Sequence, residues 1–405
     1  MSSSIPQPAP VRLPFPRAPR YGCADQDAAS ALLTAGRLSD TGRGEAITAL
    51  EDAFATLTDT RYALSFNSGT ASLHGALRGV GVHPDAGVIT SPLTWISAIL
   101  VAFHAGSYPI FADIEPGGVN LDPAGLGAVG PACAVLATHA FGIPARMDAL
   151  AAAAGVPIVE DCSHAHGARY AGRPVGSWGA TGCFSLMERK PVSGGEGGVL
   201  TTNSRTVYER ALTLGHHPHR LRAELTDPAL HALESTGLGY KTRMPALAAA
   251  IATAQLRRLT DRMAASEANL TALLEVLNAH DAPVTTPPLA DGSVRGWYGT
   301  PLLITRPVAD PGATFAACTA AGAPVRQLYD DWLSSPLLQD PTLMADAFPH
   351  VRNTPWRPPD PDQFPNYQAA RRHTLLLKVP DVPAKDYMHQ VGDALAAVLT
   401  QTLTF

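Results

Sequence analysis

The stretch IVEDCSHAHGARY, residues 158–170, joins a short apolar run to an aspartate and two histidines. The run has the length of a strand, so Asp161 stands at its carboxyl end and His164 follows three positions later in a turn. Ligands of open α/β sheets bind outside the carboxyl ends of strands, which makes this stretch a candidate site. It could be a metal centre, a catalytic acid–base cluster or the seat of an organic cofactor.

Short apolar runs alternate with helix-like stretches from about residue 60 to residue 205. The runs of strand length are YALSF, GVIT, YPIFADI, ACAVLAT, VPIVED, TGCFSL and GVLTT, and they are bounded by Gly, Pro, Asn or Asp. Between them lie alanine- and leucine-rich stretches such as ARMDALAAAAG. This alternation predicts an α/β fold in which helices cover a mainly parallel sheet.

The length of the chain favours two domains. With 405 residues, 46% of them hydrophobic, it can bury a large and a small core. We expect a flexible, proline-rich arm in residues 1–20 and a large domain in residues 21–245. A long helical stretch from about Pro245 then leads to a smaller C-terminal α+β domain within residues 246–405.

Composition excludes several classes of partner. The net charge of −5, without a dense Lys/Arg tract, argues against nucleic acid. We see no secretory signal and no apolar stretch long enough to span a bilayer. The five scattered cysteines form no CxxC pair and are interpreted as small buried residues. We expect a cytoplasmic protein.

The stretch SFNSGTASLHGAL, residues 65–77, predicts a phosphate seat. A strand ends at Phe66 and a helix begins near Ser68, Gly69 and Thr70, where free N–H groups and the helix dipole suit an anion. An ordinary helix cap by Asn67 or Ser68 is the alternative.

Two further residues follow strand-like runs. Trp95 comes after GVIT and could offer its face to an aromatic ring, although a core position is also possible. Lys190 lies in the glycine-rich stretch GCFSLMERKPVSGGEGGVLTTN, residues 182–203. It is either a surface lysine or the amine of a Schiff base, because glycines let the backbone approach a ligand closely.

Together these features indicate which of the three kinds of site lies at residues 158–170. Asp161, His164 and His166 offer few metal ligands and have no Cys/His partner at a familiar spacing, so we expect no metal. A phosphate seat, a ring-facing aromatic residue, a strand-end acid and a later lysine are what pyridoxal phosphate requires. We therefore expect this cofactor.

The chain resembles the fold type I pyridoxal-phosphate enzymes and, among them, the DegT-like sugar aminotransferases. The resemblance rests on stretches in the family's order, namely residues 36–77, 90–123, 138–185, 190–203 and 237–259. It implies a fold type I aminotransferase with a large mixed, mainly parallel sheet between helices and a smaller C-terminal α+β domain.

The resemblance also implies roles for individual residues. Lys190 is similar to the lysine that holds the cofactor and moves a proton, and Asp161 to the partner of the pyridine nitrogen. His164 matches the residue that touches the phenolic oxygen. The remaining matches are to the phosphate (Gly69, Thr70 and Ser185) and to the face of the ring (Trp95). Lys241 stands in GYKTRM where many members read GYNYRM, and either reaches the phosphate in the neighbouring subunit or is exposed.

The implied activity is transamination, because the dehydratases of the family carry histidine in place of Lys190. Glutamate or glutamine would donate the amino group to a ketone or aldehyde of a sugar or cyclitol, in specialised-metabolite or antibiotic biosynthesis. The alternatives are a small non-sugar oxo compound as acceptor, or a catalytically idle relative with a regulatory role.

The resemblance also implies a homodimer with sites at the subunit interface, to which Lys241 and Arg243 are candidate contributions from the partner. Arg243 and Arg326 are the candidates for binding the carboxylate of the donor. The histidine-rich segment GHHPHR, residues 215–220, either lines the acceptor pocket or forms a polar loop.

Overall fold

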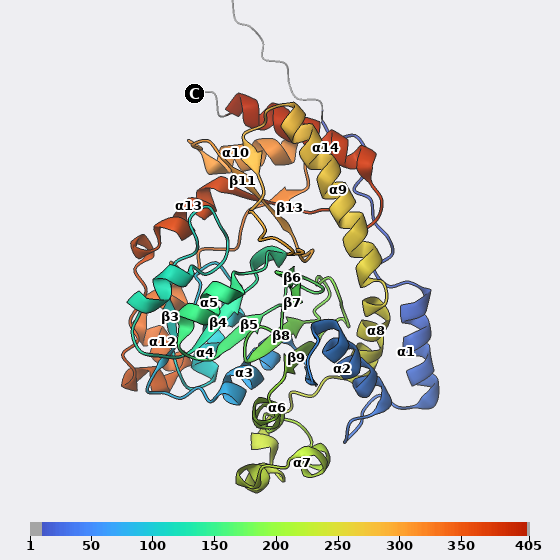
Figure 1. The fold of residues 1–405 in the computed structure, drawn as a ribbon, viewed down its shortest axis with the longest axis vertical. Coiled ribbons are helices and arrows are strands. Elements are labelled where there is room, and N and C mark those ends of the chain that lie inside the picture. Colours follow the sequence, from blue (N-terminus) through green and yellow to red (C-terminus); the bar gives the residue numbers. More distant parts are fainter. Residues whose placement is uncertain (1–9, 403–405) are drawn as a thin grey trace, which may run out of the picture.

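The computed structural model describes residues 10–402, and its centre is a seven-stranded sheet with the order β1-β9-β8-β5-β4-β2-β3 (Figure 1). Its strands are β1 (Tyr62–Phe66), β2 (Gly87–Thr90), β3 (Pro109–Phe111), β4 (Ala132–Thr138), β5 (Ile158–Asp161), β8 (Thr181–Ser185) and β9 (Gly198–Thr202). Strand β9 is antiparallel to both of its neighbours, and the other pairs are parallel. The predicted α/β fold with a mainly parallel sheet is confirmed, and each predicted run contains one of these strands.

Helices cover both faces of this sheet. Successive strand residues point to opposite faces, so neighbouring residues pack against different helices. Leu136 packs in a cluster with helices of one face, while its neighbour Val135 packs in a cluster with α5 on the other. The first face carries α3 (Gly69–Val80), α4 (Ile96–His104) and α6 (Arg205–Leu212); the second carries α2 (Glu45–Thr58), α5 (Met147–Ala154) and α8 (Ala246–Leu256). Both faces are thus buried, which explains the continuous apolar runs.

A smaller antiparallel sheet lies in the C-terminal part, with the order β10-β11-β13-β12 (Figure 1). Its strands are β10 (Val284–Thr285), β11 (Thr300–Ile304), β12 (Val325–Arg326) and β13 (Thr374–Leu377). Helices α9 (Leu259–Ala279), α10 (Pro311–Ala320) and α14 (Lys385–Thr402) share one apolar cluster with these strands.

Shorter elements complete the fold. They are α1 (Cys23–Ala35), α7 (Pro218–Glu224), α11 (Pro336–Gln339), α12 (Pro341–Ala347), α13 (Pro365–His373), the hairpin of β6 (Arg169–Tyr170) and β7 (Arg173–Pro174), and the 3₁₀ helices η1 (Pro123–Ala128), η2 (Ala140–Gly142), η3 (Pro228–Leu233), η4 (Gly237–Gly239), η5 (Pro349–Asn353) and η6 (Pro361–Gln363). No helix within residues 10–402 is long and apolar enough to cross a membrane.

The long helix predicted from Pro245 is interrupted. Helix α8 ends at Leu256 and α9 begins at Leu259, with Arg258 between them at φ −102° and ψ 0°. Nη2 of Arg258 lies 2.5 Å from the carboxylate of Asp25 in α1. The break lets α8 pack on α1 and α2 while α9 packs on α14.

Other expectations meet the structure only in part. Residues 1–9 of the predicted arm lie outside the described residues, whereas the N–H groups of Arg12 and Leu13 both donate to Oε1 of Gln390. Cys23 is exposed and Cys133 half-buried, so the expectation of buried cysteines was wrong for these two. A division of the chain at residue 245 stays a proposal.

A buried carboxylate ties α2 to β1 and α7. The Glu51 side chain is fully buried, and its oxygens accept hydrogen bonds from the N–H and hydroxyl of Ser65 at 2.9 Å. They also accept two bonds from the Arg220 guanidinium, at 3.0 and 2.9 Å, and one from Arg43. The charges of Glu51 and Arg220 are therefore paired away from water, while Arg43 lies at the edge of the group.

We expect Glu51→Gln to lower the free energy of unfolding by about 3–5 kcal/mol, because the buried Arg220 would keep only the partly exposed Glu224 as a counter-charge. Urea denaturation measures the change. Glu45→Gln is the matched control, since the Glu45–Arg37 pair is exposed and 3.8 Å apart, and should cost less than about 1 kcal/mol. Equal losses in the two variants would contradict this role of Glu51.

Candidate active site

Several predicted site residues meet at one edge of the large sheet. Strands β1, β5 and β8 point the same way, because β1 and β8 are both antiparallel to β9 and β5 is parallel to β8. Asp161 ends β5, Ser185 ends β8, and helix α3 begins at Gly69 shortly after β1. The carboxyl ends of these strands therefore present an acid, a hydroxyl and a helix N-terminus together.

The start of α3 is a small, open anion seat. The Ser68 hydroxyl caps the helix by accepting from the N–H of Ala71 at 3.1 Å. In the described part of the chain, the N–H groups of Gly69 and Thr70 have no acceptor. A Cβ at Gly69 would lie 2.7 Å from Cβ of Ser185, so only glycine allows this approach. Free N–H groups at a helix start suit a phosphate.

The Lys190 loop joins β8 to β9 at the same edge and is held by its backbone. The Lys190 N–H donates to the carbonyl of Met187 at 2.9 Å, and the side chain of Arg20 donates to the carbonyl of Lys190. Arg262 donates to the carbonyl of Pro191 at 2.7 Å. The loop is therefore fixed although it contains several glycines.

The amine of Lys190 is buried beside an aromatic ring. Its side chain is 7% exposed, and Nζ lies 4.1 Å from the ring centroid of Tyr298. Burial lowers the pKa of Lys190, while Tyr298 and Asp161 oppose the shift. The carboxylate of Asp161 is 5% exposed and accepts the N–H of Ser163 at 3.1 Å. Asp161 and Lys190 are thus both nearly out of water, and the charge of Asp161 favours the ammonium form of Lys190.

The hydrogen bonds of His164 fix its tautomer. Nδ1 accepts the N–H of Phe141 at 3.2 Å, so the proton sits on Nε2, which lies 2.9 Å from the hydroxyl of Tyr329. Phe141 has φ 54°, a left-handed conformation that is strained for a bulky residue and that aims this N–H at the imidazole. To donate to an oxygen of the cofactor, the Nε2–H group would have to give up its hydrogen bond to the Tyr329 hydroxyl.

Tyr298, Tyr329 and Arg326 complete this group, and the sequence analysis did not single out the two tyrosines. The Tyr298 ring stacks on His164 with centroids 4.1 Å apart and planes 2° from parallel. Tyr329 and Arg326 lie close enough to its hydroxyl to favour the phenolate form. Burial raises the pKa of Tyr298, but Lys190 and Arg326 outweigh it and lower the pKa overall. The one signal in the sequence was the position of each tyrosine beside a short strand of the small sheet.

Trp95 closes the other side of the aromatic group. It is 47% exposed and meets Tyr329 and Trp332 edge-to-face, with centroids 5.4 and 5.6 Å apart. Its indole face is therefore available beside the residues that surround His164. Trp95 contacts the ring of Tyr329, Tyr329 lies beside Tyr298, and the ring of Tyr298 faces the amine of Lys190.

Lys241 and Arg243 lie beside the seat at α3. The Lys241 side chain is exposed, and its carbonyl accepts from Nδ2 of Asn67 at 3.3 Å, next to Ser68. Nη1 of Arg243 donates to the carbonyl of Asp40 at 3.1 Å. The Lys241 side chain makes no hydrogen bond or ion pair within residues 10–402.

The residues present fit pyridoxal phosphate. The free N–H groups at α3 fit its phosphate, and Asp161 is a buried carboxylate that can accept a ring N–H. Lys190 is a buried amine, more easily deprotonated than a free lysine. Trp95 leaves a face for a flat ring.

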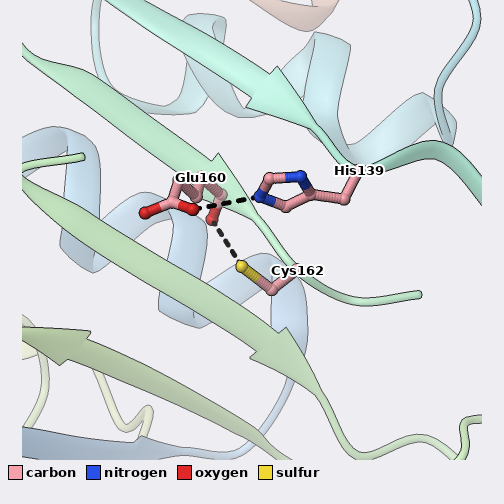
Figure 2. Close-up of side chains that lie close together, drawn as sticks. All are labelled: His139, Glu160 and Cys162. Atoms are coloured by element: carbon pink, nitrogen blue, oxygen red, sulfur yellow. Dashed lines mark hydrogen bonds and ion pairs between the residues drawn. The ribbon is translucent and has the colours of Figure 1, made fainter. Parts of the chain in front are cut away.

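A separate buried cluster, His139, Glu160 and Cys162, has the atom spacing of a metal site (Figure 2). Its polar atoms are already paired: Nδ1 of His139 accepts the N–H of Ala145, so Nε2–H donates to Glu160 at 3.0 Å. Glu160 also accepts from the N–H groups of Gly176 and Gly179, at 2.8 and 2.7 Å. The cluster therefore ties β4, β5 and the turn before β8 together.

The chain was compared with known proteins. The model of the DegT/DnrJ/EryC1/StrS aminotransferase family matches residues 22–354. The spore coat polysaccharide biosynthesis protein SpsC of Bacillus subtilis (strain 168) is 36% identical over 226 residues, which is 54% of this chain and 58% of that protein. The match thus spans little more than half of that relative.

Solved structures share the whole fold. The crystal structure of 3-amino-5-hydroxybenzoic acid (AHBA) synthase has a TM-score of 0.80 and 26% identity, with 97% of this chain and all of the other covered. The aminotransferase from Psychrobacter cryohalolentis has a TM-score of 0.79, 24% identity, and coverage of 96% and 100%. The predicted fold type I architecture is confirmed.

The family model covers most of the chain and includes Asp161, Ser185 and Lys190. The chain belongs to the DegT/DnrJ/EryC1/StrS aminotransferase family, whose cofactor is pyridoxal phosphate.

Proposed function

We propose that the protein is an aminotransferase that moves an amino group from glutamate or glutamine to a carbonyl group of a sugar or cyclitol. The observation that carries the proposal is the buried amine of Lys190, placed with Asp161 at the edge of the sheet where α3 offers free N–H groups. An idle relative would have no chemical use for such a lysine. We also propose a cytoplasmic location and a role in specialised metabolism.

Each residue has a separate task in this proposal. Pyridoxal phosphate, when bound, withdraws electrons from the carbon that carries the substrate's amine. Lys190 holds the cofactor and carries a proton on Nζ. Asp161 keeps the ring nitrogen protonated, Gly69, Thr70 and Ser185 hold the phosphate, and Trp95 lies against the ring. His164 donates from Nε2 to the phenolic oxygen.

For the donor we propose Arg326 as the group that pairs with the α-carboxylate. Its guanidinium carbon lies 5.2 Å from the ring centroid of Tyr298, the same ring that faces Lys190 at 4.1 Å. Its positive charge also contributes to lowering the pKa of Lys190. Arg243 instead donates to the carbonyl of Asp40 and, within residues 10–402, has no hydrogen bond, ion pair or ring contact with this aromatic group.

We propose that the protein works as a homodimer with Lys241 reaching the neighbouring subunit's cofactor phosphate. The exposed Lys241 side chain has no contact within residues 10–402, although its backbone lies at the edge that carries the site. An exposed lysine in this place is free to serve an adjacent chain. For the acceptor, the sugar or cyclitol ring remains the proposal, and a small non-sugar oxo compound is the alternative.

Lys190→Ala should abolish transamination and remove the visible absorbance that the protein shows when pyridoxal phosphate is attached to a lysine. Lys385→Ala is the control, because Lys385 is exposed at the start of α14. Absorbance spectra and single-turnover assays with glutamate and glutamine measure both effects. Turnover that survives in Lys190→Ala would refute the assignment, and an unchanged spectrum of the wild type with every amino donor would support the idle relative.

Attachment of pyridoxal phosphate to the cofactor-free protein should speed up with rising pH and level off below about pH 10.4, the pKa of a free lysine. The reason is that burial lowers the pKa of Lys190, so its amine is uncharged at a lower pH. Arg326→Met should move the midpoint upward, because the arginine charge also disfavours the ammonium form. Rates of the absorbance change between pH 6 and about 10.4 test this. A midpoint at the free-lysine value would contradict it.

Arg326→Met should raise the KM for the amino donor about 10- to 100-fold, the loss expected for a hydrogen bond to a charged group. The visible absorbance should stay. Arg306→Met is the control, since Arg306 is exposed in the same part of the chain. Steady-state kinetics with glutamate and glutamine give the result. A larger effect of Arg243→Met than of Arg326→Met would show that the donor binds elsewhere.

A further inference from the structure

The amine of Lys190 lies over the ring of Tyr298, with Nζ 4.1 Å from the ring centroid. Within residues 10–402, Nζ makes no hydrogen bond and no ion pair, so no polar group of this part of the chain holds it at contact distance. A buried ammonium group without hydrogen bonds costs free energy, and the negative face of an aromatic ring offsets part of that cost. The ring is therefore the feature that stabilises the amine in this position.

The backbone before β11 brings Tyr298 to the amine. The N–H of Gly296 donates to the carbonyl of Gly142 at 2.8 Å. A Cβ at Gly296 would lie 2.6 Å from Cα of Ala165, so only glycine lets this segment pass so close to the turn after β5. That turn also carries His164, on which the ring of Tyr298 stacks. The segment is thus held against the large sheet by its backbone and by its aromatic side chain.

Stacking fixes the plane of the Tyr298 ring. The imidazole of His164 lies 2° from parallel to it, with the centroids 4.1 Å apart. His164 is itself held, because Nδ1 accepts the N–H of Phe141 and Nε2 lies 2.9 Å from the Tyr329 hydroxyl. A ring held in this way keeps its face in one place. The position that it gives to the amine of Lys190 is therefore defined by the fold.

The other charged and titratable groups around this amine come from several elements. They are Asp161 at the end of β5, His164 and His166 in the turn after it, Arg326 in β12, and Arg20 and Arg262, which bind carbonyls of the Lys190 loop. Burial lowers the pKa of both histidines, to about 3 for His166, so neither is charged near neutral pH. Asp161 raises the pKa of Lys190 and Arg326 lowers it. A substitution of Tyr298 leaves all of these groups in the chain.

We propose that Tyr298 is a positioning residue that holds the amine of Lys190 whenever Nζ is not attached to the cofactor. The inference rests on the proposed function, in which Nζ carries a proton while the cofactor holds the substrate's amine. A lysine has a flexible four-carbon stem, so a free amine would sample many positions. The face of the ring limits Nζ to one of them, and a fixed position of the proton carrier is what fast proton transfer requires.

Labelling of the cofactor-free, full-length protein with acetic anhydride tests the contact directly. The reagent acetylates only the uncharged amine, so the rate at Lys190 across a range of pH, followed by mass spectrometry, gives the pKa of this amine. Tyr298→Leu removes a group that favours the ammonium form. It should lower the pKa of Lys190 and raise its acid dissociation constant about tenfold. Tyr298→Phe keeps the ring and should be labelled as the wild type is.

A variant with the same packing keeps the test decisive if Tyr298→Leu does not fold. Pentafluorophenylalanine in place of Tyr298 preserves a six-membered aromatic ring of similar size, but its fluorines reverse the sign of charge on the ring face. It should therefore lower the pKa of Lys190 as Tyr298→Leu does, whereas Tyr298→Phe should not. Circular dichroism checks that each variant is folded.

Turnover of the holoenzyme gives a second measurement. Tyr298→Leu should lower kcat with glutamate or glutamine about 10- to 100-fold, because an amine that is not held reaches the reacting carbon less often. Tyr298→Phe should keep most of the wild-type kcat. Trp297→Leu is the matched control, since this neighbouring aromatic residue packs against the apolar cluster of the small sheet. It should leave the labelling of Lys190 and kcat unchanged.

Two results would overturn the inference. If Tyr298→Phe changes the labelling as much as Tyr298→Leu, the hydroxyl acts on the amine and the ring face does not hold it. If Tyr298→Leu keeps wild-type labelling and turnover, Tyr298 has no such role, and the proposed aminotransferase still stands. A wild type that does not transaminate, while Tyr298→Leu still shifts the labelling of Lys190, would refute the proposed function and support the contact between amine and ring.

Discussion

The geometry of a parallel sheet is the constraint on which the rest of this structure depends. Strands that run the same way bring their carboxyl ends to one edge, and there the chain places Asp161, Ser185 and the start of α3. Strand β9 runs the other way, so the loop that links it to β8 lies at this same edge and carries Lys190 with it. One reversed strand is thus enough to bring the amine to the anion seat.

Burial then sets the chemistry of that edge. The amine of Lys190 is out of water, so burial lowers its pKa, although the nearby Tyr298 and the charge of Asp161 oppose the shift. The backbone N–H of Phe141 fixes the proton of His164 on Nε2. An acid, an amine and an imidazole of fixed tautomer therefore lie together at this edge, held in place before any substrate binds, which is the preorganisation that catalysis uses.

A cavity of about 280 Å³ lies beside β1, and Ser65, His216 and Arg243 are among the residues that line it. Nη1 of Arg243 donates to the carbonyl of Asp40 there, and Arg220, which also lines the cavity, is held by Glu51. Family membership gives the reaction its class.

The sequence by itself determined the strands of the large sheet, the α/β class and the positions of Gly69, Asp161 and Lys190. Apolar runs report burial, and the residue after a buried strand stands at its carboxyl end whatever lies far away in the chain. Tertiary structure alone decided that Tyr298 stacks on His164, which is 134 positions earlier, because such a contact depends on how the small sheet meets the large one. It also decided the break at Arg258, where Asp25 of α1 provides the partner. Each of these depends on which distant faces pack together, and the local pattern of apolar residues does not indicate that.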